Sequence, residues 1–221
     1  NDKAHQPRED GPCGPGLRLR VWVLPSTWGR YVAGQDVGSG QLDGDATVLQ
    51  VLDQGGNHVA EIYGRSSMSS AVQASVRLLE RYRQGLHWPL WAPERTGNDG
   101  FVELVIATGW PNIFRAKPKD WEHPDRERPY GWDTTPKSRR KMIEDLIEAI
   151  NHGNVTTYDQ EFLQDCQRFK MDEHLPDRVA AMAIAWQVRQ GEPVASWHGP
   201  EADRRDTVGA SNARPFGSYW R

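Results

Sequence analysis

The feature that most constrains this chain is a series of four short segments with the apolar pattern of β-strands. Leucine and valine occupy every second position from 17 to 23, which is the period of a half-buried strand. Three similar segments follow at 30–36, 46–52 and 58–63, separated by short glycine-containing stretches that suit hairpin turns. We therefore expect the fold to begin with an antiparallel meander.

Helical and strand-like segments alternate after the meander. Beyond Ser69 and Ser70, either of which suits a helix cap, apolar residues recur at helical spacing up to Gly85. The short apolar segment 88–94 then predicts a buried strand, 101–108 predicts a helix, and 112–115 predicts a further strand. Strand-helix-strand order favours parallel pairing with the helices packed on the sheet.

Three helices are expected in the second half of the chain. Thr135 as cap and Pro136 at the first position predict a helix that ends at Gly153. A second helix is expected to begin at Asp159, and a third, apolar on most sides and therefore buried, spans about 176–190. Before them, three prolines and a glycine in residues 117–133 predict a long surface loop, and loops of this length are often functional.

The predicted class is α/β. The order of elements, an antiparallel three-strand meander followed by parallel strands with flanking helices, is that of an RNase H-like mixed sheet. We expect one such domain at residues 17–190, because 221 residues with 37% hydrophobic residues can bury one sizeable core. Residues 1–16 are expected to be a flexible lead-in, and 191–221, rich in Pro, Gly, Arg and Ser without a period, a flexible tail.

Composition excludes some classes of function. No run approaches the roughly 18 apolar residues that a membrane-spanning helix needs, so no membrane partner is expected. The two cysteines have no zinc-site spacing, and a reducing compartment is expected. The formal net charge of -3 provides no global basic field, so contacts with DNA would come from local patches.

Three carboxylates stand where they could share one site. Asp36 ends a strand-like segment before a glycine-rich turn, and Glu94 ends an apolar run, where an unpaired acid is costly. Asp177 lies in the first turn of the last helix. If the two strands are neighbours and the helix packs across their ends, the three acids converge, and their mutual repulsion favours a divalent cation.

All-oxygen ligands suit Mg²⁺ or Mn²⁺. Two such ions about 4 Å apart can activate a water and stabilise a leaving 3′-oxygen in phosphodiester hydrolysis. Asp45 is a possible additional ligand, or a cap for the turn before its strand. Each acid also has an ordinary structural interpretation: Asp36 as a turn residue, Glu94 as an ion-pair partner, and Asp177 as a helix N-terminal charge. His174 is interpreted as a surface residue.

A possible DNA contact is formed by basic residues near the predicted loop. Side chains of this kind can follow phosphates, although a basic cluster at a helix start is commonly a solvated face. The candidates are Arg115, Lys117, Lys137, Arg139, Arg140 and Lys141.

Five motifs, in order and spacing over roughly residues 21–190, resemble the nuclease domain of phage large terminases, a member of the RNase H-like superfamily. They are Gly34-Gln35-Asp36-Val37-Gly38, Gly44-Asp45-Ala46-Thr47-Val48, Ala92-Pro93-Glu94-Arg95, Gly131-Trp132-Asp133-Thr134-Thr135 and Pro176-Asp177-Arg178-Val179-Ala180-Ala181.

The resemblance implies a metal-dependent endonuclease that cuts concatemeric double-stranded DNA during genome packaging in the host cytoplasm. It assigns the metals to Asp36, Glu94 and Asp177. It also implies a terminase ATPase domain, a small terminase subunit and a portal or procapsid as partners. No G-x-x-x-x-G-K-[ST] motif occurs, so we expect an ATPase domain to precede this chain in the whole protein.

One departure from the family pattern leaves the number of metal ions open. The last motif often reads His-Asp-Asp, whereas this chain has Leu175-Pro176-Asp177. Two other functions remain: a DNA- or portal-docking module that does not cut, and another nuclease of the same fold, of the resolvase or transposase type. An actin-like kinase, whose phosphate loop resembles the segment after Asp36, is disfavoured because that fold needs two domains.

Overall fold

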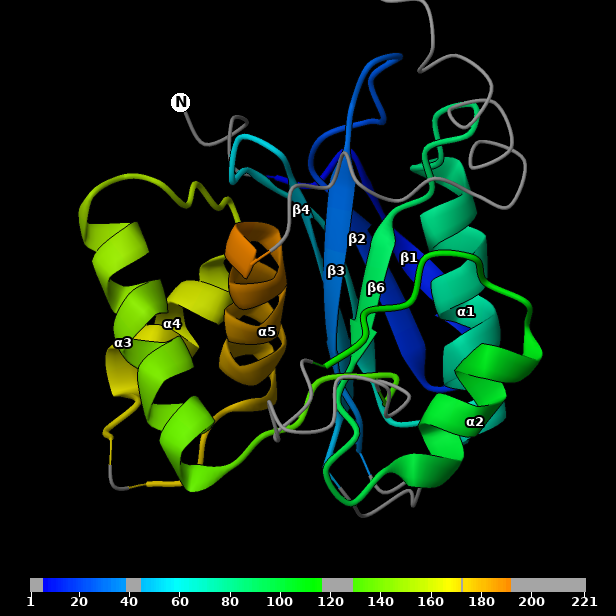
Figure 1. The fold of residues 1–221 in the computed structure, drawn as a ribbon. Coiled ribbons are helices and arrows are strands. Elements are labelled where there is room, and N and C mark those ends of the chain that lie inside the picture. Colours follow the sequence, from blue (N-terminus) through cyan, green and yellow to red (C-terminus); the bar gives the residue numbers. More distant parts are fainter. Residues whose placement is uncertain (1–5, 39–44, 117–128, 172, 192–221) are drawn as a thin grey trace, which may run out of the picture.

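The structure is a computed structural model that describes residues 6–38, 45–116, 129–171 and 173–191. It contains a mixed sheet with helices on both faces (Figure 1). The strands are β1 (Glu9–Gly14), β2 (Leu17–Val21), β3 (Tyr31–Asp36), β4 (Thr47–Asp53), β5 (His58–Gly64) and β6 (Leu90–Pro93). The helices are α1 (Met68–Arg81), α2 (Asp99–Ala107), α3 (Pro136–Asn151), α4 (Gln160–Arg168) and α5 (Asp177–Gly191).

The six strands are arranged in the order β1-β2-β5-β4-β3-β6. Strands β3, β4 and β5 form the antiparallel meander, and β2 and β1 extend it in antiparallel pairing beyond β5. Strand β6 reaches the sheet after α1 and pairs parallel with β3. This crossover places the carboxyl ends of β3 and β6 at the same edge of the sheet, which confirms the predicted mixed α/β class.

Two apolar cores lie on opposite faces of the sheet. Helices α1 and α2 cover one face, and α3, α4 and α5 cover the other (Figure 1). Alternate residues of each strand face the two cores, as the period of two requires: Ala33 belongs to the α1 side and Val32 to the α5 side. Helix α5 lies directly on β3 and β4, and α3 covers α5 from outside.

The helices begin where local chemistry favours a start. Thr135 caps α3 with Pro136 at its first position, as predicted, and the capping box is completed by Ser138. Asp159 caps α4, so this helix starts within one residue of the predicted position. The cap of α1 is Ser67, two to three residues earlier than the serines proposed for it, and its side chain accepts a hydrogen bond from the Ser70 N–H.

Three details of the predicted fold are wrong. Residues 9–14, expected in a flexible lead-in, form edge strand β1. Their Gly- and Pro-containing sequence does not predict a strand, and the antiparallel pairing with β2 stabilises it. The strand predicted from 17–23 does not join its sequence neighbour β3 but pairs with β5. The strand expected at 112–115 is reduced to isolated bridges, from Ile113 to Trp91 and from Arg115 to the segment 130–131.

Parts of the predicted organisation lie outside the described residues. These are positions 1–5 of the lead-in, most of the loop at 117–133, and the tail beyond Gly191. Within the described ranges, no helix combines the length and apolarity that crossing a membrane requires.

Candidate functional site

Two of the predicted acids emerge from neighbouring parallel strands. Asp36 is the last residue of β3, and Glu94 follows the last residue of β6. The Glu94 backbone N–H donates to the carbonyl of Gln35 at 2.8 Å, which continues the pairing of the two strands to the point where the acids leave the sheet. Both side chains are half-buried. Their proximity therefore follows from the register of β3 and β6.

The chain after Asp36 must pass very close to the start of β4. A Cβ added to Gly38 would lie 1.9 Å from the carbonyl oxygen of Asp45, so only glycine fits this crossing. The Gly38 N–H is satisfied by the hydroxyl of Thr47 at 3.1 Å. The close crossing at Gly38 thus places Asp45 near the same edge of the sheet.

The third acid comes from α5. Asp177 is the first residue of this helix, which crosses β3 and β4. Its carboxylate accepts a hydrogen bond from the Ala46 backbone N–H at 3.0 Å, so the helix start is joined to the start of β4. The predicted arrangement, two neighbouring strands with a helix across their ends, is therefore present.

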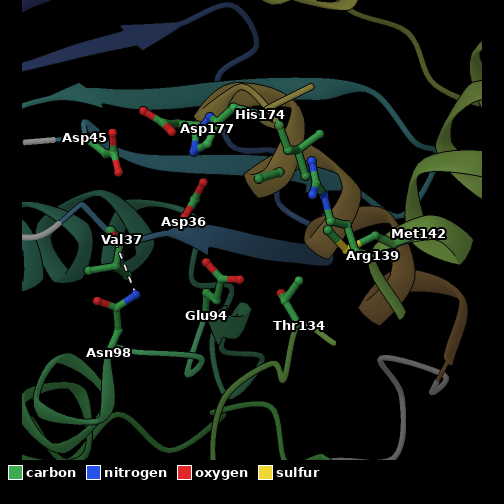
Figure 2. A pocket seen from close by; sticks show the side chains of 12 residues that line it. Asp36, Val37, Asp45, Glu94, Asn98, Thr134, Arg139, Met142, His174 and Asp177 are labelled. Carbon is green, nitrogen blue, oxygen red and sulfur yellow. Dashed lines mark hydrogen bonds between the residues drawn. The ribbon is translucent and has the colours of Figure 1, made fainter. Parts of the chain in front are cut away.

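These elements enclose a pocket of about 290 Å³. Figure 2 shows Asp36 between Glu94 and Asp177, with the three carboxylates turned into the same space and Asp45 beside Asp177. The pocket is lined by Asp36, Val37, Asp45, Glu94, Asn98, Thr134, Arg139, Met142, His174, Leu175, Asp177 and Ala180. One wall is thus acidic, while Arg139, His174 and Thr134 belong to the remaining lining.

The acids perturb one another. Burial raises the pKa of Asp36 well above its usual value, and the charge of Glu94, a hydrogen bond to it and the charge of Asp177 raise it further. Burial also raises the pKa of Asp177, and the negative charge of Asp45 raises it further. The hydrogen bond from the Ala46 N–H and the charges of His174 and Arg65 lower this pKa, but by less than the increase. Without a cation, this pocket therefore disfavours full ionisation of its carboxylates.

The donor set fits a hard divalent cation, because four carboxylates and an imidazole line the pocket. Among the residues that the structure describes, however, no group of three or more acidic, histidine or cysteine side chains already has the spacing of a metal site. The carboxylates would have to rotate toward a common point to bind one ion. A metal would then remove the repulsion that raises the pKa of Asp36.

The basic residues proposed for DNA contact differ in their surroundings. Arg139, in the first turn of α3, lines the pocket, and its Nη2 donates to the Glu173 carbonyl at 2.7 Å. Arg140 and Lys141 are exposed and pair with acids one turn further along α3. Lys137 is exposed, the Arg115 guanidinium lies 4.0 Å from the centre of the Tyr130 ring, and Lys117 lies outside the described residues.

Sequence reasoning missed three polar pocket residues. His174 is exposed, as interpreted, but it also lines the pocket beside Asp177. Thr134 lines it near Glu94, and its buried hydroxyl finds no hydrogen-bond partner among the described residues. Asn98 donates to the Val37 carbonyl at 3.3 Å. The resemblance motif containing Thr134 was the only available signal, since the residue itself follows no apolar period.

The fold matches solved nuclease domains of phage large terminases. The domain from thermophilic phage G20c with bound zinc is 20% identical, with a TM-score of 0.61, covering 82% of this chain and 91% of that one. The magnesium-bound form is 18% identical, with a TM-score of 0.61 and coverage of 82% and 90%. The Thermus phage P74-26 domain is 19% identical, with a TM-score of 0.58 and coverage of 82% and 88%.

No protein-family model and no protein of curated function matches the sequence. At these identities, the structural matches establish the fold.

Proposed function

We propose that this chain, which has the fold of phage large-terminase nuclease domains, is a divalent-metal-dependent DNA endonuclease. The observation that carries the proposal is the convergence of Asp36, Glu94 and Asp177 on one pocket. These residues are far apart in the sequence, and they meet because two neighbouring parallel strands end where helix α5 begins.

The acids of the pocket hold Mg²⁺ or Mn²⁺, one ion or two. Asp36, Glu94 and Asp177 are the ligands, and Asp45 and His174 are close enough to the same space to add donors. A bound ion supplies activation of a water and stabilisation of the leaving 3′-oxygen. Arg139 faces this space with a permanent positive charge and is suited to a phosphate oxygen of the backbone.

The proposed substrate is concatemeric double-stranded DNA, cut during packaging of a viral genome in the host cytoplasm. The likeness to terminase domains supports this role. It implies a terminase ATPase domain, a small terminase subunit and a portal or procapsid as partners. Phosphate contacts would be local, because the chain as a whole carries a net charge of -3.

Cleavage of supercoiled plasmid tests the proposal. The native chain should nick and linearise plasmid with Mn²⁺ or Mg²⁺ and not with EDTA. Asp36→Asn, Glu94→Gln and Asp177→Asn should each lower the rate by 100-fold or more, as an order of magnitude, because each removes a ligand charge needed in the transition state. Asp10→Asn is the matched control, since Asp10 pairs with Arg18 at the surface.

The outcomes separate cleavage from docking. Metal-dependent cutting that is lost in the three pocket variants and kept in the control supports the nuclease. A folded native chain that binds DNA without cutting in either metal would instead favour the non-cleaving docking module. Cutting that survives in Asp36→Asn would place the active site elsewhere.

A further inference from the structure

A second group of charged and polar residues lies between the sheet and helices α4 and α5, away from the pocket lining; most of it is buried, and Glu161 is at its exposed side. Its centre is Glu61 on β5, which is 1% exposed. The group consists of Arg20, Gln50, Glu61, Asp159, Glu161, Asp165 and Arg178. These residues come from β2, β4, β5, the start of α4, α4 itself and α5, and we call them the Glu61 network.

Arg178 is the link between this network and the candidate active site. It follows Asp177 in the first turn of α5 and is only 8% exposed. Its Nε donates to Glu61 at 3.0 Å and its Nη1 to Asp165 at 3.4 Å, while Nη2 binds Glu161. The guanidinium also lies 3.7 Å from the centre of the Tyr63 ring. Strand β5 and helix α4 therefore hold the side chain in one orientation.

Glu61 is itself held from several directions. Arg20 of β2 binds one carboxylate oxygen, with its Nε at 3.2 Å. Gln50 of β4 donates to the other oxygen at 2.8 Å, the same atom that accepts from Arg178. The carboxylate that receives Arg178 thus belongs to the rigid centre of the sheet and not to a loop.

Helical geometry transmits this restraint to Asp177. Successive residues of an α-helix are about 100° apart around the axis, because one turn contains 3.6 residues. Arg178 points into the network while Asp177 points into the pocket, where its carboxylate accepts from Ala46. Fixing the direction of one side chain fixes the rotation of the first turn, and with it the direction of the other.

Apolar packing also holds this helix, since Val179, Met182 and Ile184 of α5 belong to the core on this face of the sheet. Where α5 crosses β3, Gly34 lies close to the backbone of Ala181 and Ala185. Buried ion pairs are expensive to desolvate, and apolar residues of similar volume often stabilise a fold as well or better. The paired guanidinium of Arg178 fixes the orientation of its own side chain, because its hydrogen bonds have a defined geometry.

The geometry points to Arg178 and Glu61 as positioning residues, which orient Asp177 for metal binding through the first turn of α5. This role rests on the proposed function of Asp177 as a metal ligand. Neither residue lines the pocket or touches the reacting atoms. Loss of a direct hydrogen bond to a metal ligand typically lowers metal affinity about 10- to 100-fold, and because Arg178 acts on Asp177 through the backbone of the first turn, an effect at the lower end of this range is expected.

The test is calorimetric titration of Mn²⁺ into the native full chain and into Arg178→Lys, which keeps the charge but loses the planar fork. The expected result is an apparent Kd for Mn²⁺ raised by about 10-fold or more. The kcat for plasmid cleavage should fall while the KM for DNA stays within about 2-fold, because the restraint acts on a metal ligand and not on DNA binding.

Two controls separate positioning from general loss of stability. Arg18→Lys repeats the substitution in an exposed pair on β2 and should leave Mn²⁺ affinity unchanged. Leu78→Ala removes a buried side chain of α1 on the other face of the sheet, and should lower the Tm without changing Mn²⁺ affinity. If Arg178→Lys does not fold, Glu61→Gln, which keeps the shape of the side chain, is measured in the same way.

Unchanged Mn²⁺ affinity in the folded variant would overturn the inference, and so would an equal loss in Leu78→Ala. If the native chain cuts DNA while either result is found, only the positioning role fails. A native chain that neither binds Mn²⁺ nor cuts DNA would overturn the proposed function together with it.

Discussion

Replacement of Gly34 by alanine should separate the acids of the pocket. Gly34 lies two residues before Asp36, at the point where α5 crosses β3. An added Cβ would lie 2.2 Å from the Ala181 carbonyl oxygen and 2.3 Å from the Ala185 nitrogen. Both contacts are with backbone, so no side chain can rotate away. Reaching an ordinary contact distance requires α5 to move by about 1 Å from β3.

The size of the effect follows from that displacement. Overpacking of a core typically costs about 1–3 kcal/mol. For a domain of this size, about 2 kcal/mol lowers the Tm by roughly 4–8 °C. Asp177 moves with α5 while Asp36 stays on β3, and a misplacement of about 1 Å can lower a catalytic rate by about 100-fold. The rate should therefore fall by far more than the lost stability explains.

The assay is plasmid cleavage with Mn²⁺, well below the Tm of both proteins, alongside thermal unfolding. Gly11→Ala is the matched control, because an added Cβ at Gly11 meets nothing within 4 Å and should change neither quantity. A Gly34→Ala protein with native Tm and native cleavage rate would refute the reasoning. It would mean that α5 does not approach β3 as closely as described.

Two further predictions concern charge. Arg139→Ala should weaken binding of a short DNA duplex and reduce the slope of log binding constant against log salt concentration by about 1, because one phosphate contact is lost. Arg140→Ala, which removes an exposed arginine paired with Glu144, is the control and should change the slope less. Equal slopes in the two variants would argue against a phosphate contact by Arg139. In EDTA, the unfolding free energy should fall as pH rises from the ordinary Asp36 value of 3.8 through its raised pKa, since the folded protein holds a proton there that the unfolded chain releases. Thermal unfolding measured from about pH 4 to 8 tests this: Mn²⁺ should restore the lost stability, and Asp36→Asn should make the Tm less dependent on pH. A Tm in EDTA that rises over this range in both the native chain and Asp36→Asn would contradict the raised pKa of Asp36.

Much of the candidate site could be predicted from the sequence because its acids stand at element boundaries. Asp36 and Glu94 end apolar segments, and Asp177 begins an apolar helix, so their positions follow from periodicity alone. Whether the two strands are neighbours is a long-range property that periodicity does not contain. It is a condition of the predicted site, and the parallel pairing of β3 and β6 meets that condition.

The missed features depend on tertiary contacts. Residues 9–14 have no alternating pattern and become a strand through pairing with β2. Exposed His174 and half-buried Arg139 follow no apolar period, so their place in the pocket depends on how α3 and α5 dock. Glu61 occupies an ordinary strand position, and its burial among charged partners appears only once α4 and α5 are in place.

The most direct test of the central claim is the anomalous scattering of Mn²⁺ in crystals of the native chain soaked at neutral pH. The account predicts one or two strong peaks in the pocket, within bonding distance of Asp36, Glu94 and Asp177, after rotation of the carboxylates toward the ion. An empty pocket in crystals that take up Mn²⁺ elsewhere would contradict the claim that these acids form a metal centre.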